Sequence, residues 1–137
     1  MAGAVRVVCL GGRIPSGVLV QEDGMGRYMF LVLTNATEGR DEEFNDWYNN
    51  RHLPDVLAVE GFVAAQRYKM VELDPPQASG HRYMALYEVE AEDLAKANQA
   101  LMNTAGTDAM VLSEALDMGS ATAIYFEPIT ERVVAPS

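Results

Sequence analysis

The alternation of apolar and polar positions divides this chain into short elements that begin near Arg27. Residues 28–33 form a continuous apolar run of aromatic and aliphatic side chains, ended by a Thr-Asn pair, which is typical of a buried strand. Residues 41–51 open with acidic side chains and then repeat aromatic residues at helical spacing, which indicates an amphipathic helix. Because Leu53 precedes Pro54, we expect this helix to break there and to leave His52 at its end.

The rest of the chain continues the same alternation. In one predicted strand, Tyr83 and Tyr87 fall on alternate positions and therefore face one side of the sheet. Residues 1–26 are rich in glycine and predict a loose extension, or a short hairpin from Arg6 to Val20. The remaining predicted elements are strands over residues 62–73 and 81–89, helices over residues 91–104 and 108–117, and a strand over residues 120–128, followed by a tail over residues 129–137.

The order strand, helix, strand, strand, helix, strand predicts one α+β domain over residues 27–128. It is the order of the ferredoxin-like βαββαβ unit with a four-stranded antiparallel sheet. Two helices cover only one face of such a sheet, yet residues 28–33 are apolar at every position, so we expect both faces to be removed from water. A second copy of the chain is the commonest cover for an apolar face. The sequence therefore predicts a homodimer with face-to-face sheets, a dimeric α/β barrel.

Composition and charge narrow the classes of partner. The chain has 137 residues, enough for one domain, and 20 acidic against 10 basic residues give a formal net charge of -10. The negative electrostatic field of such a chain disfavours binding to nucleic acid and to anionic membrane surfaces. Arg6 interrupts the apolar N-terminal run, and no apolar stretch is long enough for a membrane span, so we expect neither a secretion signal nor a membrane protein. A lone Cys9 cannot form an internal disulfide, which favours a cytoplasmic protein.

Metal and cofactor motifs are not evident. His52 and His81 are the only histidines, and no His or Cys pair stands at metal-ligand spacing. The glycine pairs near the N-terminus lack the strand-loop-helix context of a phosphate loop, and no serine elbow is present. We therefore expect no metal and no cofactor, while haem ligation by His52 alone stays an open alternative.

A family resemblance rests on the tract that surrounds His52. Residues 43–62 and 66–68 read EFNDWYNNRHLPDVLAVEGF and QRY. This aromatic helix, the His-Leu-Pro triplet, the short turn, Gly-Phe and the outgoing strand resemble EthD-like proteins over residues 27–128. The resemblance implies a dimeric α/β barrel. It also implies small-molecule chemistry of several kinds, because relatives on this scaffold include lactone isomerases, polyketide cyclases and cofactor-free monooxygenases.

His52 is the candidate catalytic residue, because an imidazole accepts or donates a proton near neutral pH. Tyr48 lies four residues earlier and is a candidate to orient His52 or to bind a substrate oxygen, while Asp55 is a candidate to fix the imidazole tautomer. The competing interpretation is structural, since a histidine at a helix end commonly caps carbonyl groups and the other two side chains can cap or hydrate a turn.

Aromatic and basic side chains form a second group of candidates. Phe44 is assigned to the core, and aromatic residues at helical spacing are more often core than ligand contacts. Phenols on strands can hold a substrate oxygen or fill the interior, and arginines can bind a carboxylate or form ordinary ion pairs. The candidate substrate-binding residues are Trp47, Tyr68, Tyr83, Tyr87 and Arg67.

Three functions remain open on the sequence. The first is a cofactor-independent isomerase, cyclase or lyase that uses His52 as a proton shuttle on a small apolar cyclic or aromatic metabolite. The second is a non-catalytic protein that binds such a ligand as an accessory of a catabolic or biosynthetic pathway. The third is a cofactor-free monooxygenase. An apolar cavity that exposes His52 beside a phenol would favour the first.

Overall fold

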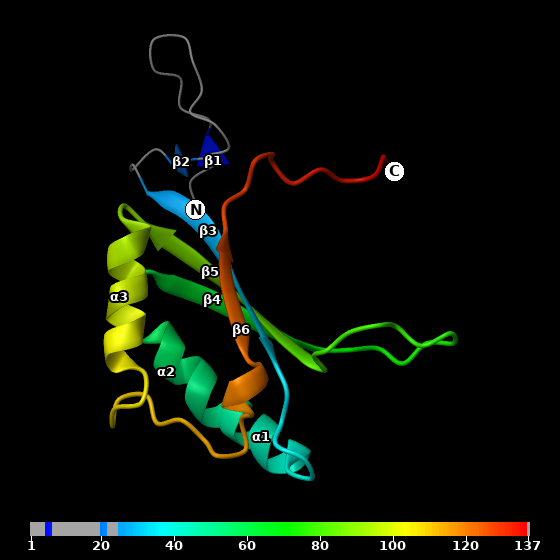
Figure 1. Ribbon diagram of the computed structural model, residues 1–137. Coiled ribbons are helices and arrows are strands. Elements are labelled where there is room, and N and C mark those ends of the chain that lie inside the picture. Colours follow the sequence, from blue (N-terminus) through cyan, green and yellow to red (C-terminus); the bar gives the residue numbers. More distant parts are fainter. Residues whose placement is uncertain (1–4, 7–19, 22–24, 137) are drawn as a thin grey trace.

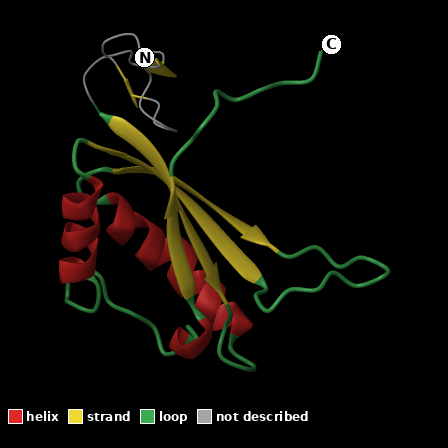
Figure 2. Ribbon diagram, turned by 45° about the horizontal axis from the view of Figure 1, so that its top comes forward, coloured by secondary structure: helices red, strands yellow, loops and turns green. Residues whose placement is uncertain are grey.

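Four antiparallel strands form the main sheet, and all helices lie on one of its faces (Figures 1 and 2). The computed structural model describes residues 5–6, 20–21 and 25–136. The strands β3 (Gly26–Thr34), β4 (Phe62–Lys69), β5 (Tyr83–Ala91) and β6 (Thr122–Phe126) are arranged in the order β6-β3-β5-β4. The predicted α+β ferredoxin-like class is confirmed by this order of elements and strands.

Two short strands extend the sheet beyond β3. β1 (Val5–Arg6) pairs with β2 (Val20–Gln21), and β2 meets β3 where Val20 lies opposite Gly26. The hairpin expected from Arg6 to Val20 lies mostly outside the described residues.

The face of the sheet toward the helices carries the core. Alternate residues of β5 from Tyr83 to Ala91 are buried, because their side chains point into the layer between sheet and helices. Tyr83 and Tyr87 share this face, as predicted. Across from β5, Phe30 of β3 stacks on Tyr125 of β6 with ring centroids 4.2 Å apart. None of the described helices covers the opposite face of the sheet (Figures 1 and 2).

The first helical segment is continuous where a break was predicted. α1 (Asp41–Trp47) runs into a π-helical turn, η1 (Tyr48–His52), and then into α2 (Leu53–Leu57). Leu53 keeps helical angles, φ -58° and ψ -49°, and its N–H donates to the carbonyl oxygen of Tyr48. The donor lies five positions after its acceptor, so the widened turn relieves the clash that Pro54 would cause in a regular helix. The predicted helix end at His52 is therefore wrong.

Further elements differ from the predictions. α3 (Leu94–Thr104) begins after Asp93, whose carboxylate accepts from the N–H of Lys96, and ends before Gly106 at φ 85°. The predicted helix over residues 108–117 is absent, and a loop leads to the short helix η2 (Met118–Ser120). In that loop the Thr107 hydroxyl bonds backbone groups on both sides, which competes with helix formation.

β4 ends at Lys69 and not at residue 73 as predicted. The segment between β4 and β5 projects from the body as an extended arm (Figure 1). Pro75 and Pro76 in this arm have no N–H to donate to a neighbouring strand, so the pairing stops short of them. Within the described ranges, none of the helices is long and apolar enough to cross a membrane.

Candidate functional site

A cavity of about 200 Å³ lies between the sheet and the helical layer. Its wall combines side chains from β3, β5, β6, η1, α2, α3 and the loop that follows α3. Most of the wall is apolar, including Phe30, Val56, Leu101 and Met110. Its polar side chains are Thr34, Tyr48, His52 and Tyr87, and no acidic side chain, lysine or arginine is among its described lining residues. An apolar pocket with a few convergent polar groups is the usual form of a small-molecule site.

The π-helical turn places the His52 ring between two aromatic side chains. The ring stacks on Trp47, with centroids 4.6 Å apart and an interplanar angle of 23°. Tyr48 meets it edge-on, with centroids 4.9 Å apart and an angle of 89°. Trp47 is itself held, because its indole N–H donates to the carbonyl oxygen of Val111 at 3.0 Å. His52 is therefore positioned by stacking, which leaves its nitrogens available for other contacts.

Burial keeps the imidazole of His52 neutral. Loss of solvent lowers the pKa of His52 from 6.5 to about 4, Asp55 opposes this shift with its negative charge, and Arg67 adds to it with its positive charge. The buried Nδ1 atom has no hydrogen-bond partner among the described residues. At pH 7 the ring thus has one protonated nitrogen and one free lone pair, which is the form that accepts a proton.

Tyr48 and Tyr87 form a buried phenol pair in the cavity wall. The hydroxyl of Tyr87 donates to the hydroxyl oxygen of Tyr48 at 3.2 Å. Burial raises the pKa of both phenols, so both remain protonated at neutral pH. Because the Tyr48 oxygen already accepts this bond, its own proton is available to a ligand oxygen in the cavity.

Arg67 packs against the Tyr48 ring from outside the cavity. Its guanidinium carbon lies 4.3 Å from the centroid of the Tyr48 ring and 5.6 Å from that of Tyr83. One of its terminal nitrogens donates to the side-chain oxygen of Asn49 at 2.7 Å, and burial lowers the pKa of the guanidinium. Arg67 is not among the described residues that line the cavity, and it contacts the cavity only through the Tyr48 ring.

The structure brings only part of the predicted site together. His52, Tyr48 and Tyr87 line one cavity, and Trp47 backs His52. Three other candidates lie apart from this group. The Tyr83 hydroxyl donates to the Asp41 carboxylate at 2.6 Å, and Asp55 forms an ion pair with Arg51 at 3.0 Å. Tyr68 is 40% exposed and lies on the face of the sheet opposite the helices. The proposed roles of these residues stay predictions.

Sequence reasoning missed the parts of the wall that come from later elements. Thr34, at the end of β3, lines the cavity and is 3% exposed. Met102 reaches it from α3, Met110 from the loop after α3, and Met118 from η2. The only signal for Thr34 was its position, an even number of residues after Phe30 on the same strand face.

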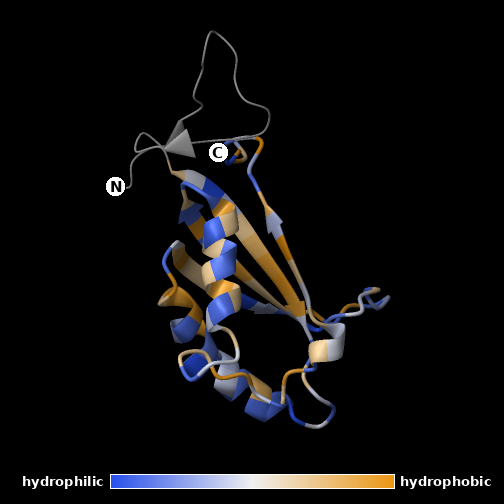
Figure 3. Ribbon diagram, turned by 60° about the vertical axis from the view of Figure 1, so that its left-hand side comes forward, coloured by the Kyte–Doolittle hydropathy of each residue, from blue (hydrophilic) through white to orange (hydrophobic). Residues whose placement is uncertain are grey.

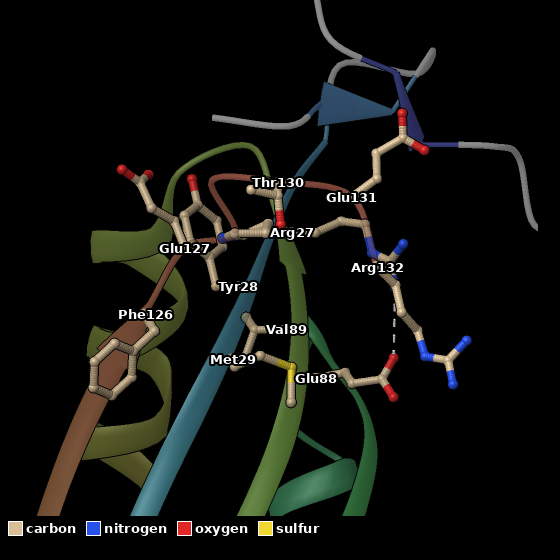
Figure 4. A pocket seen from close by; sticks show the side chains of 11 residues that line it. Arg27, Tyr28, Met29, Glu88, Val89, Phe126, Glu127, Thr130, Glu131 and Arg132 are labelled. Carbon is tan, nitrogen blue, oxygen red and sulfur yellow. Dashed lines mark ion pairs between the residues drawn. The ribbon is translucent and has the colours of Figure 1, made fainter. Parts of the chain in front are cut away.

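A larger groove, of about 550 Å³, lies at the other end of the sheet (Figure 4). Residues at the ends of β3, β5 and β6 and the first residues of the tail surround it, among them Met29, Phe126 and Arg132. Across the groove, Arg27 and Glu88 form an ion pair at 3.8 Å. It holds none of the predicted site residues, so we place the candidate site in the smaller cavity. In the part of the chain that is described, no group of three His, Cys, Asp or Glu side chains is arranged to hold a metal ion.

The burial of His52 has a measurable consequence for stability. The pKa of His52 is about 4 in the folded state and 6.5 in the unfolded state. As the pH falls below 6.5, the imidazole is therefore protonated in the unfolded state before it is protonated in the folded state. The free energy of unfolding is therefore unaffected by His52 protonation above pH 6.5. It falls by about 2–3 kcal/mol between pH 6.5 and pH 4 for a pKa shift of this size. Urea unfolding at pH 7 and pH 4.5 should show a larger loss for the wild type than for His52→Gln. Equal losses in the two proteins would contradict the burial of a neutral imidazole.

A comparison with family models decides the family. The model described as "Domain of unknown function (DUF4286)" matches residues 27–109, which is more than half of the chain. The chain belongs to the DUF4286 family. The matched residues of this DUF4286 protein include β3 from Arg27 onward, the whole helical segment from α1 to α2, β4, β5 and α3. They therefore also include His52, Tyr48, Tyr87 and Thr34.

Among solved structures, the DUF4286 protein is similar to an ethyl tert-butyl ether d (EthD) family protein from Bacillus halodurans. The identity is 16%, the TM-score is 0.43, and the match covers 73% of this chain and 97% of that chain. At this level the likeness transfers no function. No curated protein matches the chain significantly.

Proposed function

We propose that this protein is a cofactor-independent enzyme of the isomerase, cyclase or lyase type, with His52 as proton shuttle. The observation that carries the proposal is the cavity itself. It brings a neutral imidazole and a phenol with an available proton into one apolar space. These are the two groups that proton transfer beside a carbonyl requires, a base for the C–H and a donor for the oxygen.

The proposed step is an enolisation. Neutral His52 removes a proton from the carbon next to a ligand carbonyl, and the electron pair of that C–H bond moves to form the C=C bond of an enolate. The hydroxyl of Tyr48 donates to the developing oxyanion, and Tyr87 supports Tyr48 through the bond at 3.2 Å. Protonated His52 then returns its proton to the same carbon or to another one. Return to another carbon gives an isomer, with no net change in protons or electrons.

Hydrogen–deuterium exchange tests this step without knowledge of the natural substrate. In D₂O, the methyl protons of acetophenone, a small aromatic ketone, should exchange faster with the protein than without it. His52→Gln should lose this acceleration by at least about 100-fold, because general base catalysis commonly contributes that much. His81→Gln is the matched control, since His81 bonds the carbonyl oxygen of Ser120 and lies outside the cavity. Equal exchange by wild type and His52→Gln would overturn the role of His52.

The second candidate is a non-catalytic small-ligand binding protein. It is favoured by one observation, the low pKa of His52, because an imidazole with a pKa of about 4 is a weak base. This alternative expects ligand binding without exchange, and the same affinity in the wild type and in His52→Gln. Isothermal titration beside the exchange assay separates the two functions.

We also propose that the active form is a homodimer. The face of the sheet opposite the helices is apolar at its centre, and Figure 3 shows most of the strand ribbons in the hydrophobic colour. Leu31 lies at its centre, with Leu86 of β5 on one side and Ile124 of β6 on the other. Ile124 is 42% exposed and Phe126 is 50% exposed in the single chain. A second copy of the same face is a self-complementary cover for such a surface.

A further inference from the structure

Arg67 carries a positive charge that no carboxylate neutralises in the part of the chain that the structure describes. Its guanidinium carbon lies over aromatic rings instead, 4.3 Å from the centroid of Tyr48, 5.4 Å from that of Phe44 and 5.6 Å from that of Tyr83. Four other described arginines each have a carboxylate oxygen within 4.0 Å, namely Arg27, Arg40, Arg51 and Arg82. Since the chain has a net charge of -10, acidic partners are abundant, and the unpaired position of Arg67 needs another explanation.

Packing alone does not explain an arginine at this position. Burial lowers the pKa of the guanidinium, so the charged form is destabilised there. One terminal nitrogen donates to Asn49 at 2.7 Å, but the buried Nε atom has no hydrogen-bond partner among the described residues. A methionine would cover the same rings without a charge to remove from water or a donor to leave unsatisfied. The charge thus destabilises the empty protein, and a negative charge that develops nearby would offset this.

The two reacting groups of the cavity have charged neighbours of opposite sign. Tyr48 has Arg67 against its ring. His52 is followed three residues later by Asp55, which lies on the same side of the helix one turn further on. At His52 the negative charge of Asp55 raises the pKa more than the positive charge of Arg67 lowers it. The positive charge is therefore on the phenol side, and the negative charge is on the imidazole side.

Few other charges act on this part of the cavity. Arg51 pairs with Asp55 at 3.0 Å, but its side chain is 51% exposed and that of Asp55 only 21%, so water screens the arginine more strongly. The other polar side chains of the described cavity wall are uncharged at neutral pH, namely Thr34, Tyr48 and Tyr87. The field at the reacting groups is thus set mainly by Arg67 and Asp55.

We propose that Arg67 and Asp55 are positioning residues that stabilise the separated charges of proton transfer in the cavity. This inference rests on the proposed function, because it concerns the same step. When neutral His52 takes the proton of the C–H bond, a positive charge forms on the imidazole and a negative charge on the ligand oxygen bonded to Tyr48. Arg67 stabilises the negative charge and Asp55 the positive one. Both are in place before the reaction, which is the condition for effective electrostatic stabilisation.

Neutral replacements of Arg67 test its role in the exchange assay with acetophenone. Arg67→Met keeps a side chain that covers Tyr48 and removes the charge, so exchange should slow by about tenfold, the effect of one partly screened charge at this range. Arg67→Gln, a second neutral variant, should show the same loss. Arg67→Lys keeps the charge and should stay within about threefold of the wild type. The matched control is Arg82→Met, because Arg82 pairs with Glu72 at 4.0 Å, and its exchange should equal that of the wild type.

Asp55→Asn tests the other charge. It should slow exchange by about threefold or more, because the imidazolium loses its stabilising neighbour. Glu42→Gln, which neutralises an exposed carboxylate in the first turn of α1, is the control and should leave the exchange rate unchanged.

Titration of the imidazole by NMR provides a readout that a purely structural role would not change. His52 and His81 are the only histidines, so both rings can be resolved, and His81 serves as internal reference. The pKa of His52, about 4 in the wild type, should rise in Arg67→Met and fall in Asp55→Asn. The opposite directions follow from the opposite signs of the two charges that are removed.

The outcomes separate this inference from the proposed function. If His52→Gln loses exchange while the neutral variants of Arg67 and Asp55 keep the wild-type rate, the inference fails and the proposed function stands. Neutral variants of Arg67 that are destabilised in urea but leave the titration of His52 unchanged would show a structural cation and would also overturn it. If the wild type itself does not accelerate exchange, the inference and the proposed function fail together.

Discussion

A Leu31→Lys variant is expected to sediment as a monomer of 15.0 kDa under conditions in which the wild type sediments at twice that mass. Leu31 is at the centre of the uncovered sheet face, in register with Leu86 and Ile124 on the flanking strands. In a two-fold pair of sheets, the substitution buries two ammonium groups without partners. Each such burial costs several kcal/mol, so the dissociation constant should rise by at least about 1000-fold.

The matched control is Leu57→Lys, at the end of α2. Leu57 is 38% exposed and lies in the helical layer, so the same chemical change should leave the oligomeric state unaltered. Sedimentation velocity at several concentrations measures both variants. A wild type that stays monomeric at all concentrations, or a Leu31→Lys variant that stays dimeric, would contradict face-to-face pairing of the sheets.

The strands were predictable from the sequence because their signal is local. The apolar run at residues 28–33 and the alternation around Tyr83 and Tyr87 follow directly from the two-residue period of a strand. From these and the two main helices, the ferredoxin-like order could be read. The loop after α3 could not be predicted, because it depends on hydrogen bonds between the Thr107 hydroxyl and the backbone that no periodicity reveals.

The helix through His52 shows how a local rule can fail. The residue before a proline normally avoids helical angles, which predicted a break at Leu53. The structure accommodates the proline within the helix through a π turn, in which the Leu53 N–H donates to the Tyr48 carbonyl oxygen. This turn rotates the last residues of the segment and stacks His52 on Trp47. The sequence indicated His52 as the candidate, and the geometry that makes it a candidate base depends on the turn.

The candidate site was predictable only where its residues lie close together in the sequence. Tyr48 and His52 belong to one short tract and were both identified, and Tyr87 was identified as one of several strand phenols. Thr34 and the three methionines come from elements far from that tract, and nothing in their local patterns distinguishes a cavity wall from ordinary core. Their part in the site follows from tertiary packing, which brings the end of β3 beside the loop after α3.

Phe44→Ala is expected to destabilise the fold by about 3–5 kcal/mol, the usual cost of truncating a fully buried phenylalanine. Phe44 has no exposed surface and joins the helix to the sheet, because its ring contacts Tyr48 at 5.5 Å and Tyr83 at 5.1 Å between centroids. Its loss leaves a void beneath Tyr48, so acceleration of ketone exchange should fall as well. Chemical unfolding measures the free energy, with the exposed Glu42→Ala on the same helix as control, expected within about 0.5 kcal/mol of the wild type. A loss below about 1 kcal/mol would mean that the helical layer is not anchored through Phe44.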